Sequence, residues 1–492
     1  MIMKYYIESD DAIRASYAMD ILLDGIGLGG KIVQSPDDAD IIYSKKAPET
    51  NERRYVWIQA DIIEDWGEIP SRIGFLDDIP VYYNRIEPRN DYRMDSLRIL
   101  GDIVYSTYVI AVGIIEKKEE KNVWGIIIGS NSSMERMGVL NTPVIARYSE
   151  LLRRQLSMIR ELHSIPRWPD GKQYAIVLTH DVDAPLSYRT SFPTITSALS
   201  KILNDAKHGK LLSCVRDSIV IGRSLTLRIV SSFLTPEEDA NFRFDDWLKI
   251  EEGLGIKSCF YFATISCSDQ YGSPADVEYR YDYPAIRRKI MKIHESNWEI
   301  GLHASINAGE SQTRLEAEKE KLEDIVGECS IEGIRHHNWA MGSTTPEKTL
   351  WNQFAAGFKY DSSFGLNDSP GFRRGMIWPY FPFDHERQSI IPVLEIPPTL
   401  MDGGIFYQRN SRKDGVDKIR RHVSIVFKHR GAVVLDWHVE QLNPRRLNNA
   451  GSALVEVLRD LEKDANIFWA SPNEMYHWWL KRKDMILEHS ST

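Results

Sequence analysis

The chain has 492 residues, too many for one ordinary hydrophobic core, so we expect two or perhaps three domains. Hydrophobic residues make up 42% of the chain and charged residues 27%, which is typical of a globular protein and excludes wholesale disorder. The net charge of −9 argues against a dedicated nucleic-acid-binding protein, which would carry a basic excess. No apolar run approaches the roughly 18 residues that a membrane span requires.

Two features of the sequence indicate the cellular compartment of the protein. The opening residues, MIMKYYIESDDAIR, reach acidic side chains before any apolar stretch develops, so we expect no signal peptide. The four cysteines show no CxxC spacing and make a poor disulfide framework. We therefore expect a cytoplasmic protein.

The N-terminal third alternates short strand-like runs with polar helical stretches. The runs are KYYIES, ADIIYS, RRYVWIQA and IPVYYN, and VWGIIIGS at 123–130 is a further candidate for a buried strand. The periodicity of residues 142–162 predicts an amphipathic helix. Proline, glycine and tryptophan punctuate residues 165–173, which is typical of a boundary. We predict a smaller accessory α/β domain over residues 1–165.

The rest of the chain, over residues 170–485, alternates strand candidates with helices. This alternation favours a barrel-like α/β domain of about seven or eight strands over a sandwich. An open doubly wound sheet is the alternative, because periodicity alone does not show closure. The strand candidates are 174–178, 258–263, 298–302, 331–334, 357–360, 392–396, 432–437 and 466–470.

Polar and ionisable residues follow six of these strands at their carboxyl ends. Such a pattern is typical of an α/β-barrel active site, which is built where the loops after the strands converge. The clearest example is THDVD after the first strand, in which Asp181 and Asp183 share one face of an extended segment. A divalent cation would relieve the repulsion between the two carboxylates and leave one of them free to act as a base. The alternative is a pair of loop aspartates that cap the next helix.

Three further segments supply candidate groups, each with a structural alternative. His303 and Asn307 are spaced i, i+4 and would face one way if the segment turned helically, or His303 could be a hydrogen-bonded structural histidine. Arg335 could orient a carboxylate, or it could form a surface ion pair. His438 follows an apolar strand and could act as a general acid, or it could be a hydrogen-bonded core histidine.

These motifs resemble those of the polysaccharide deacetylases of carbohydrate esterase family four, in the expected order over about residues 170–480. THDVD resembles the first motif, KSCFYFAT the strand that follows it, and EIGLHAS the metal-binding histidine motif. The resemblance implies a distorted (β/α) barrel and a divalent metal ion, usually Zn²⁺. It also implies a hydrolase that releases acetate from an N- or O-acetyl group.

Residue roles carry over from the resemblance position by position. Asp181 corresponds to the catalytic base and Asp183 to the metal-binding carboxylate. His303 corresponds to the first metal-binding histidine, Arg335 to the arginine that orients the base, and His438 to the general acid.

One position departs from the family pattern. The family has a second metal-binding histidine four residues after the first, and Asn307 stands there in this chain. Asparagine is a weak ligand, so we expect either a weakened site or a substitute ligand. His337, at the end of the neighbouring strand, is the candidate.

The sequence therefore predicts a metal-dependent hydrolase that removes acetyl from an N-acetylated sugar or a surface-polysaccharide precursor. One alternative is a non-catalytic carbohydrate-binding protein, and another is an amidohydrolase of the same fold acting on a small non-sugar amide. Residues 195–234 carry six basic and two acidic residues. This segment could be a lid for an anionic, nucleotide- or lipid-linked substrate, or a helical hairpin that packs on the barrel.

Overall fold

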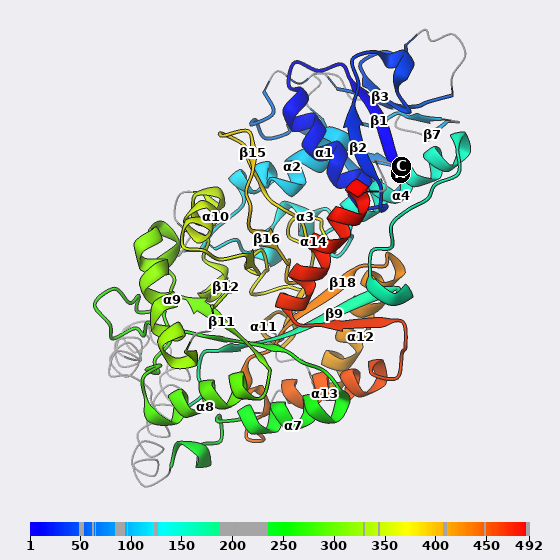
Figure 1. Ribbon diagram of the computed structural model, residues 1–492. Coiled ribbons are helices and arrows are strands. Elements are labelled where there is room, and N and C mark those ends of the chain that lie inside the picture. Colours follow the sequence, from blue (N-terminus) through cyan, green and yellow to red (C-terminus); the bar gives the residue numbers. More distant parts are fainter. Residues whose placement is uncertain are drawn as a thin grey trace.

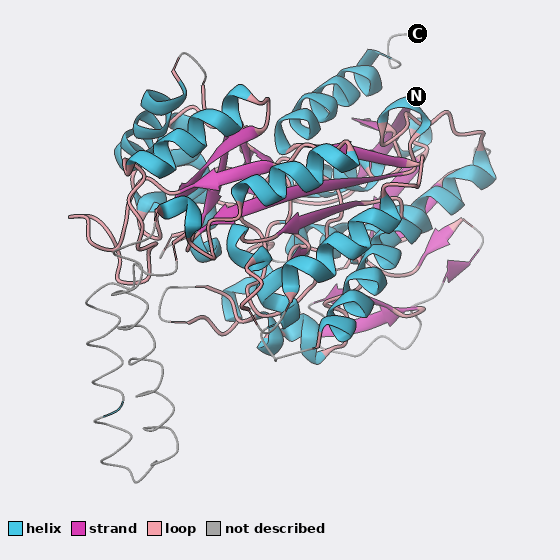
Figure 2. Cartoon of the chain, turned by 90° about the horizontal axis from the view of Figure 1, so that it is seen from below, coloured by secondary structure: helices cyan, strands magenta, loops and turns pink. Residues whose placement is uncertain are grey.

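The computed structural model spans the chain, and its described residues form two parallel sheets with helices around them (Figures 1 and 2). The description covers all residues except 49–53, 62, 64, 84–93, 96, 123–125, 187–201, 203–234, 328–329, 343–344, 407–410, 447–448 and 489–492. The basic segment 195–234 lies almost entirely outside the described residues.

The N-terminal sheet has the strand order β2-β1-β3-β4-β8-β7, and all pairs are parallel except β7 with β8. Its strands are β1 (Ile2–Ile7), β2 (Gly29–Ile32), β3 (Ile41–Ser44), β4 (Val56–Gln59), β7 (Met94–Asp95) and β8 (Arg98–Ile99). A separate antiparallel hairpin joins β5 (Arg72–Leu76) to β6 (Ile79–Tyr83). The accompanying helices are α1 (Ala12–Asp24), α2 (Ile103–Ala111), α3 (Ser133–Arg136) and α4 (Val144–Ile159).

The second sheet is parallel and curled, with the strand order β16-β13-β12-β11-β10-β9-β18-β17. A ninth strand, β19, pairs with the first half of β9. Long runs of buried residues form these strands because helices cover the sheet. The strands are β9 (Tyr174–Val182), β10 (Cys259–Phe262), β11 (Glu299–Ala304), β12 (Gly333–His336), β13 (Tyr360–Asp361), β16 (Leu394–Glu395), β17 (Leu400–Met401), β18 (Ala432–Asp436) and β19 (Ile467–Ala470).

Helices alternate with these strands and lie outside the curled sheet (Figure 2). They are α7 (Phe244–Leu254), α8 (Pro284–Glu295), α9 (Gln312–Val326), α10 (Pro346–Ala355), α11 (Asp402–Phe406), α12 (Arg412–Lys428), α13 (Ala450–Leu461) and α14 (Pro472–Glu488). A small hairpin joins β14 (Phe383–Asp384) to β15 (Ser389–Ile390). In the described chain β16 and β17 do not pair, so the barrel is distorted and open between them. The predicted fold class is confirmed.

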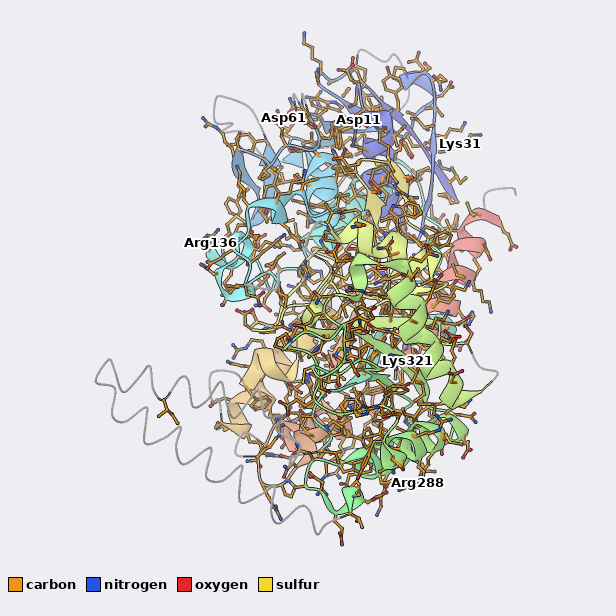
Figure 3. The ribbon with its side chains drawn as sticks, turned by 90° about the vertical axis from the view of Figure 1, so that its left-hand side faces the viewer. Asp11, Lys31, Asp61, Arg136, Arg288 and Lys321 are labelled. Atoms are coloured by element: carbon orange, nitrogen blue, oxygen red, sulfur yellow. The ribbon has the colours of Figure 1, made fainter. Side chains whose placement is uncertain are left out.

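The two sheets are joined by buried contacts. In Figure 3, Asp11, Lys31 and Asp61 mark the end with the N-terminal sheet, and Lys321 and Arg288 mark the opposite end. Helix α14 runs back toward the first sheet (Figure 1), where the buried Arg482 forms an ion pair with Asp24. Along the sequence, the strands of the first sheet come before residues 165–173 and those of the curled sheet come after them. The domain boundary at these residues stays a prediction.

The prediction of a strand at 123–130 is wrong for the residues that can be described. Only one isolated bridge, between Lys121 and Ile127, occurs there, and a 3-10 helix follows at Gly129–Asn131. Ile126 packs against Ile306 and Ala340 of the barrel, and Ile126, Ile127 and Ile128 line a cavity rather than extend a sheet. Within the described part of the chain, no helix is long and apolar enough to cross a membrane.

Candidate metal centre

One edge of the curled sheet collects the candidate side chains. Strands β12, β11, β9 and β18 lie in one run of the parallel sheet, so their carboxyl ends meet at the same edge. His303 on β11 lies opposite Arg335 on β12, and Thr179 on β9 lies opposite Asp436 on β18. The residues that reach this edge or directly follow it are Asp181, Asp183, His303, Arg335, His337, Asp436 and His438.

Asp183 lies between two imidazoles. Its Oδ1 is 3.1 Å from Nε2 of His303, and its Oδ2 is 3.3 Å from Nε2 of His337. One ligand atom from each of the three residues lies within 4.8 Å of the others. The His303 side chain is only 1% exposed, whereas that of Asp183 is 23% exposed. The cluster is therefore deep but open on the carboxylate side.

The outer nitrogens of both imidazoles are held by other groups. Nδ1 of His303 lies 3.2 Å from the backbone oxygen of Arg335, and Nδ1 of His337 lies 3.4 Å from Oδ1 of Asp276. An imidazole that donates its Nδ1 hydrogen in this way presents the lone pair of Nε2 inward. Both rings are thus arranged as metal ligands.

The donor set fits a divalent transition metal ion. One carboxylate oxygen with two imidazole nitrogens is a ligand set that catalytic zinc sites use, with further positions left for water or substrate. Asp183 Oδ1 and His303 Nε2 are buried, and neither makes a hydrogen bond of good geometry with a described residue. A cation between these two atoms would satisfy both.

Asp183 and the imidazoles around it stabilise each other's charged forms. Burial lowers the pKa of the His337 imidazole, but Asp183 more than offsets this and raises it to about 10. Burial likewise raises the pKa of Asp183, but the neighbouring imidazoles hold it well below its ordinary value. Asp183 is therefore anionic, the form in which a carboxylate binds metal.

Arg335 positions Asp181 beside this cluster. Its Nη1 donates to Oδ1 of Asp181 at 2.9 Å and to the hydroxyl of Thr179 at 2.7 Å, and it lies 3.2 Å from Asp436. Its other two nitrogens donate to the backbone oxygen and hydroxyl of Ser362. The remaining oxygen of Asp181, Oδ2, lies 3.7 Å from Nε2 of His303 and so faces the cluster.

Burial and neighbouring charges, among them Arg335, shift the pKa values of Asp181 and Asp436. Burial raises the pKa of Asp181, but Arg335 and His303 outweigh burial and lower it. Burial and Asp181 together raise the pKa of Asp436 well above its ordinary value, although Arg335 opposes them. Arg335 therefore favours the ionised form of Asp181, whereas burial and the charge of Asp181 favour the neutral form of Asp436.

His438 also lies against Asp183 and has its own carboxylate partner. Its Nδ1 is 2.9 Å from Oδ2 of Asp402, which also accepts a hydrogen bond from the backbone N–H of His438 at 2.8 Å. Its Nε2 is 3.2 Å from Oδ2 of Asp183. The ring is therefore fixed with Nε2 directed at the cluster.

The structure does not place Asn307, which the sequence predicts as a metal ligand, among the described residues that line the cavity of the cluster. Asn307 is exposed. The segment after β11 is not helical at His303, since a 3-10 helix begins only at Ala308, so the i, i+4 spacing does not bring the two side chains together. His337 stands at the cluster instead.

Two carboxylates at the site have no signal in the local sequence. Asp276 holds His337 from 61 positions away, and Asp402 holds His438 from 36 positions away. Asp402 directly follows β17, a two-residue strand that is too short to show a pattern in the sequence. Asp436 is the last residue of β18, and nothing in the sequence indicates its contact with Arg335.

The cluster opens into a cavity of about 520 Å³. This volume falls in the range of pockets that hold small molecules. The described residues that line it are Asn122, Ile126, Ile127, Ile128, Ser130, Asp181, Asp183, His303, His337, Asn338, Trp339, Asn367, Asp368, Met401, Gly403 and His438. The fold and the site together define a distorted α/β barrel with a candidate metal centre at its carboxyl end.

Comparisons with known proteins add likenesses to solved structures. No protein-family model and no curated protein matches the chain. A structure from Mycobacterium smegmatis described as a polysaccharide deacetylase is 16% identical and covers 66% of this chain and 96% of its own, with a TM-score of 0.41. A Pseudomonas aeruginosa PAO1 structure of the same description is 12% identical and covers 65% of this chain and 95% of its own, with a TM-score of 0.41. A structure of the allantoinase Puue is 11% identical and covers 65% of this chain and 94% of its own, also with a TM-score of 0.41.

Two of these three descriptions name the family that the sequence motifs resemble. At such identities and TM-scores the likenesses carry no argument about chemistry.

Proposed function

We propose that this chain is a metal-dependent hydrolase that removes an acetyl group from an N-acetylated sugar. The observation that carries the proposal is the convergence of Asp183, His303 and His337 on one point, with Asp181 and His438 beside it. A structural role alone would not require five ionisable side chains around one open cavity. The resemblance of the sequence motifs to the polysaccharide deacetylases supports the choice of an acetylated sugar.

The side chains divide the work between binding and proton transfer. Asp183, His303 and His337 would hold a divalent cation, for which we propose Zn²⁺, and it would supply Lewis acidity to polarise a carbonyl and acidify water. Asp181, fixed through Oδ1 by Arg335, has Oδ2 free to accept the proton of an attacking water.

Proton delivery falls to His438. The water oxygen bonds to the acyl carbon, the carbon–nitrogen bond breaks, and Nε2 of His438 gives a proton to the departing nitrogen. The products are acetate and a free amine. Asp402 keeps the imidazole oriented for this step through Nδ1.

Metal content and acetate release test the proposal together. We expect about one zinc or similar ion per wild-type chain by elemental analysis, loss of that ion in Asp183→Ala, and acetate release from N-acetylated sugars. Asp181→Asn should keep the metal and lose about 10²–10⁴-fold in turnover. Full activity of Asp181→Asn would refute the assignment of the base.

The alternatives predict other results. A wild-type chain without metal, even after reconstitution, would favour the non-catalytic carbohydrate-binding protein. Metal without acetate release from sugars, but with hydrolysis of small linear or cyclic amides, would favour the amidohydrolase. The cytoplasmic location and the surface-polysaccharide precursor stay predictions.

A substrate bearing an anionic group also stays a prediction, and the catalytic cavity gives it no support. None of the described residues that line this cavity is a lysine or an arginine.

A further inference from the structure

A segment of the N-terminal part forms one wall of the catalytic cavity. We call residues 126–130 the strap. Ile126, Ile127, Ile128 and Ser130 of the strap line the same cavity as Asp183, His303 and His438. In Figure 3, Arg136 of helix α3, which follows the strap, lies on the flank between Asp61 at one end and Arg288 at the other. The barrel alone therefore does not complete the site.

Apolar packing holds the strap against the two loops that carry the imidazoles. Ile126 forms a small buried cluster with Ile306 and Ala340. Ile306 stands three residues after His303, and Ala340 stands three residues after His337. The strap is thus in contact with both loops of the candidate metal centre.

A carboxylate from the barrel fixes the other end of the strap. Asp368 accepts hydrogen bonds from the backbone N–H groups of Gly129 and Ser130, each at 2.9 Å, and from the Ser130 hydroxyl. A Cβ at Gly129 would lie 3.0 Å from Oδ1 of Asp368, so the approach is close. Asp368 thus anchors the strap while it also lines the cavity.

The wall that remains for a ligand is uncharged and largely apolar. Ile127 belongs to the main hydrophobic core, but Ile128 is only half-buried and belongs to none of the hydrophobic clusters. Trp339 and Met401 add further apolar surface to the same cavity. The charged groups in the described lining are the metal-centre residues and Asp368.

We infer that the strap is the specificity element of this site, and that it selects an uncharged acylated sugar unit by contact of Ile128 with the apolar face of the ring. The inference rests on the proposed function. An anionic group on the same ring would find no cationic side chain in this described lining. It would therefore lose its hydration without gaining an ion-pair partner in that lining. An apolar wall with a few polar groups at one end is the usual form of a small-molecule site.

Binding tests the strap separately from catalysis. The Asp181→Asn protein, loaded with Zn²⁺, is titrated calorimetrically with N-acetylglucosamine and with its 6-phosphate. We expect the neutral sugar to bind more tightly. Adding Ile128→Ala should weaken its binding about tenfold, since most of an isoleucine contact is removed. Adding Ile128→Lys should reverse the preference toward the phosphate.

Ile13→Ala is the matched control, because Ile13 is 54% exposed and lies outside the cavity lining. Zinc content is measured in every variant and should stay at the wild-type level. Equal binding of the two sugars, absence of binding of both, or unchanged affinities in both Ile128 variants would overturn the inference. Acetate release by the wild-type protein reports on the proposed function, so its failure is distinguishable from failure of the strap.

Discussion

The two aspartate–histidine pairs at the site allow the metal ligand to be separated from the proton donor. Asp276 supports His337, which we assign as a ligand, and Asp402 supports His438, which we assign as the general acid. Asparagine at either position keeps the shape of the side chain but removes its charge. We therefore expect Asp276→Asn to weaken metal binding and Asp402→Asn to slow turnover.

The size of the first effect follows from the geometry around Asp276. Loss of a carboxylate partner to a ligating histidine commonly costs 10–100-fold in metal affinity. The contact with His337 is long, at 3.4 Å, and Asp276 also accepts the backbone N–H groups of Ile306 at 2.9 Å and Ser273 at 2.7 Å. Because an asparagine oxygen can keep one of these bonds, we expect the lower end of the range, about tenfold or 1.4 kcal/mol.

Competition with a chromogenic chelator measures the zinc affinity of both variants, and acetate release measures turnover. For Asp402→Asn we expect wild-type affinity and a loss of turnover of about 10²-fold, at the low end of what general acid catalysis contributes. The reasoning fails if Asp402→Asn weakens zinc binding as much as Asp276→Asn does. His438 would then be a ligand and not the proton donor.

Three further changes have expected outcomes. Arg335→Gln leaves the buried Asp181 carboxylate without its cation, so chemical denaturation should show a loss of about 3–5 kcal/mol. Asn307→Ala should leave zinc content unchanged, because Asn307 is exposed and outside the cavity. Burial lowers the pKa of His422 to about 4, against about 6.5 in an unfolded chain, so the unfolded chain binds the proton more readily. The free energy of unfolding should therefore fall by about 3 kcal/mol as the pH decreases from about 6.5 to about 4. His422 packs against Phe372, so phenylalanine should be accepted at this position. In His422→Phe this contribution should vanish from the pH dependence of denaturation.

The barrel could be predicted from the sequence because its strands are buried on both faces. Such strands appear as continuous apolar runs, and all eight candidates coincide with strands of the curled sheet. The two-residue strand β17 was missed because it is too short to show a pattern. The isoleucines of 126–128 were misassigned, since an apolar run does not reveal whether it packs into a sheet or against a cavity.

The candidate site was predictable only where side chains follow strands directly. Asp181, Asp183, His303, Arg335, His337 and His438 all belong to strand-end motifs, and the structure brings them together. Asp276 lies in a loop, and its role depends on how that loop folds over His337. The chain is not helical between His303 and Asn307, so the i, i+4 spacing does not place Asn307 on the cavity wall, and its role as a ligand stays a prediction.

The loop that carries His337 has a strained backbone, and the N-terminal part packs against it. Asn338 and Trp339 both have positive φ, at 56° and 58°, and for tryptophan this conformation costs on the order of 1–3 kcal/mol. A loop strained in this way persists only where contacts with the surrounding structure hold its backbone in place. Asn367 donates to the backbone oxygen of Asn338 at 3.1 Å, and Ile126 of the strap packs on Ala340. The strap therefore helps to hold the strained turn that directs His337 at Asp183, so the N-terminal part supports the candidate metal centre through packing.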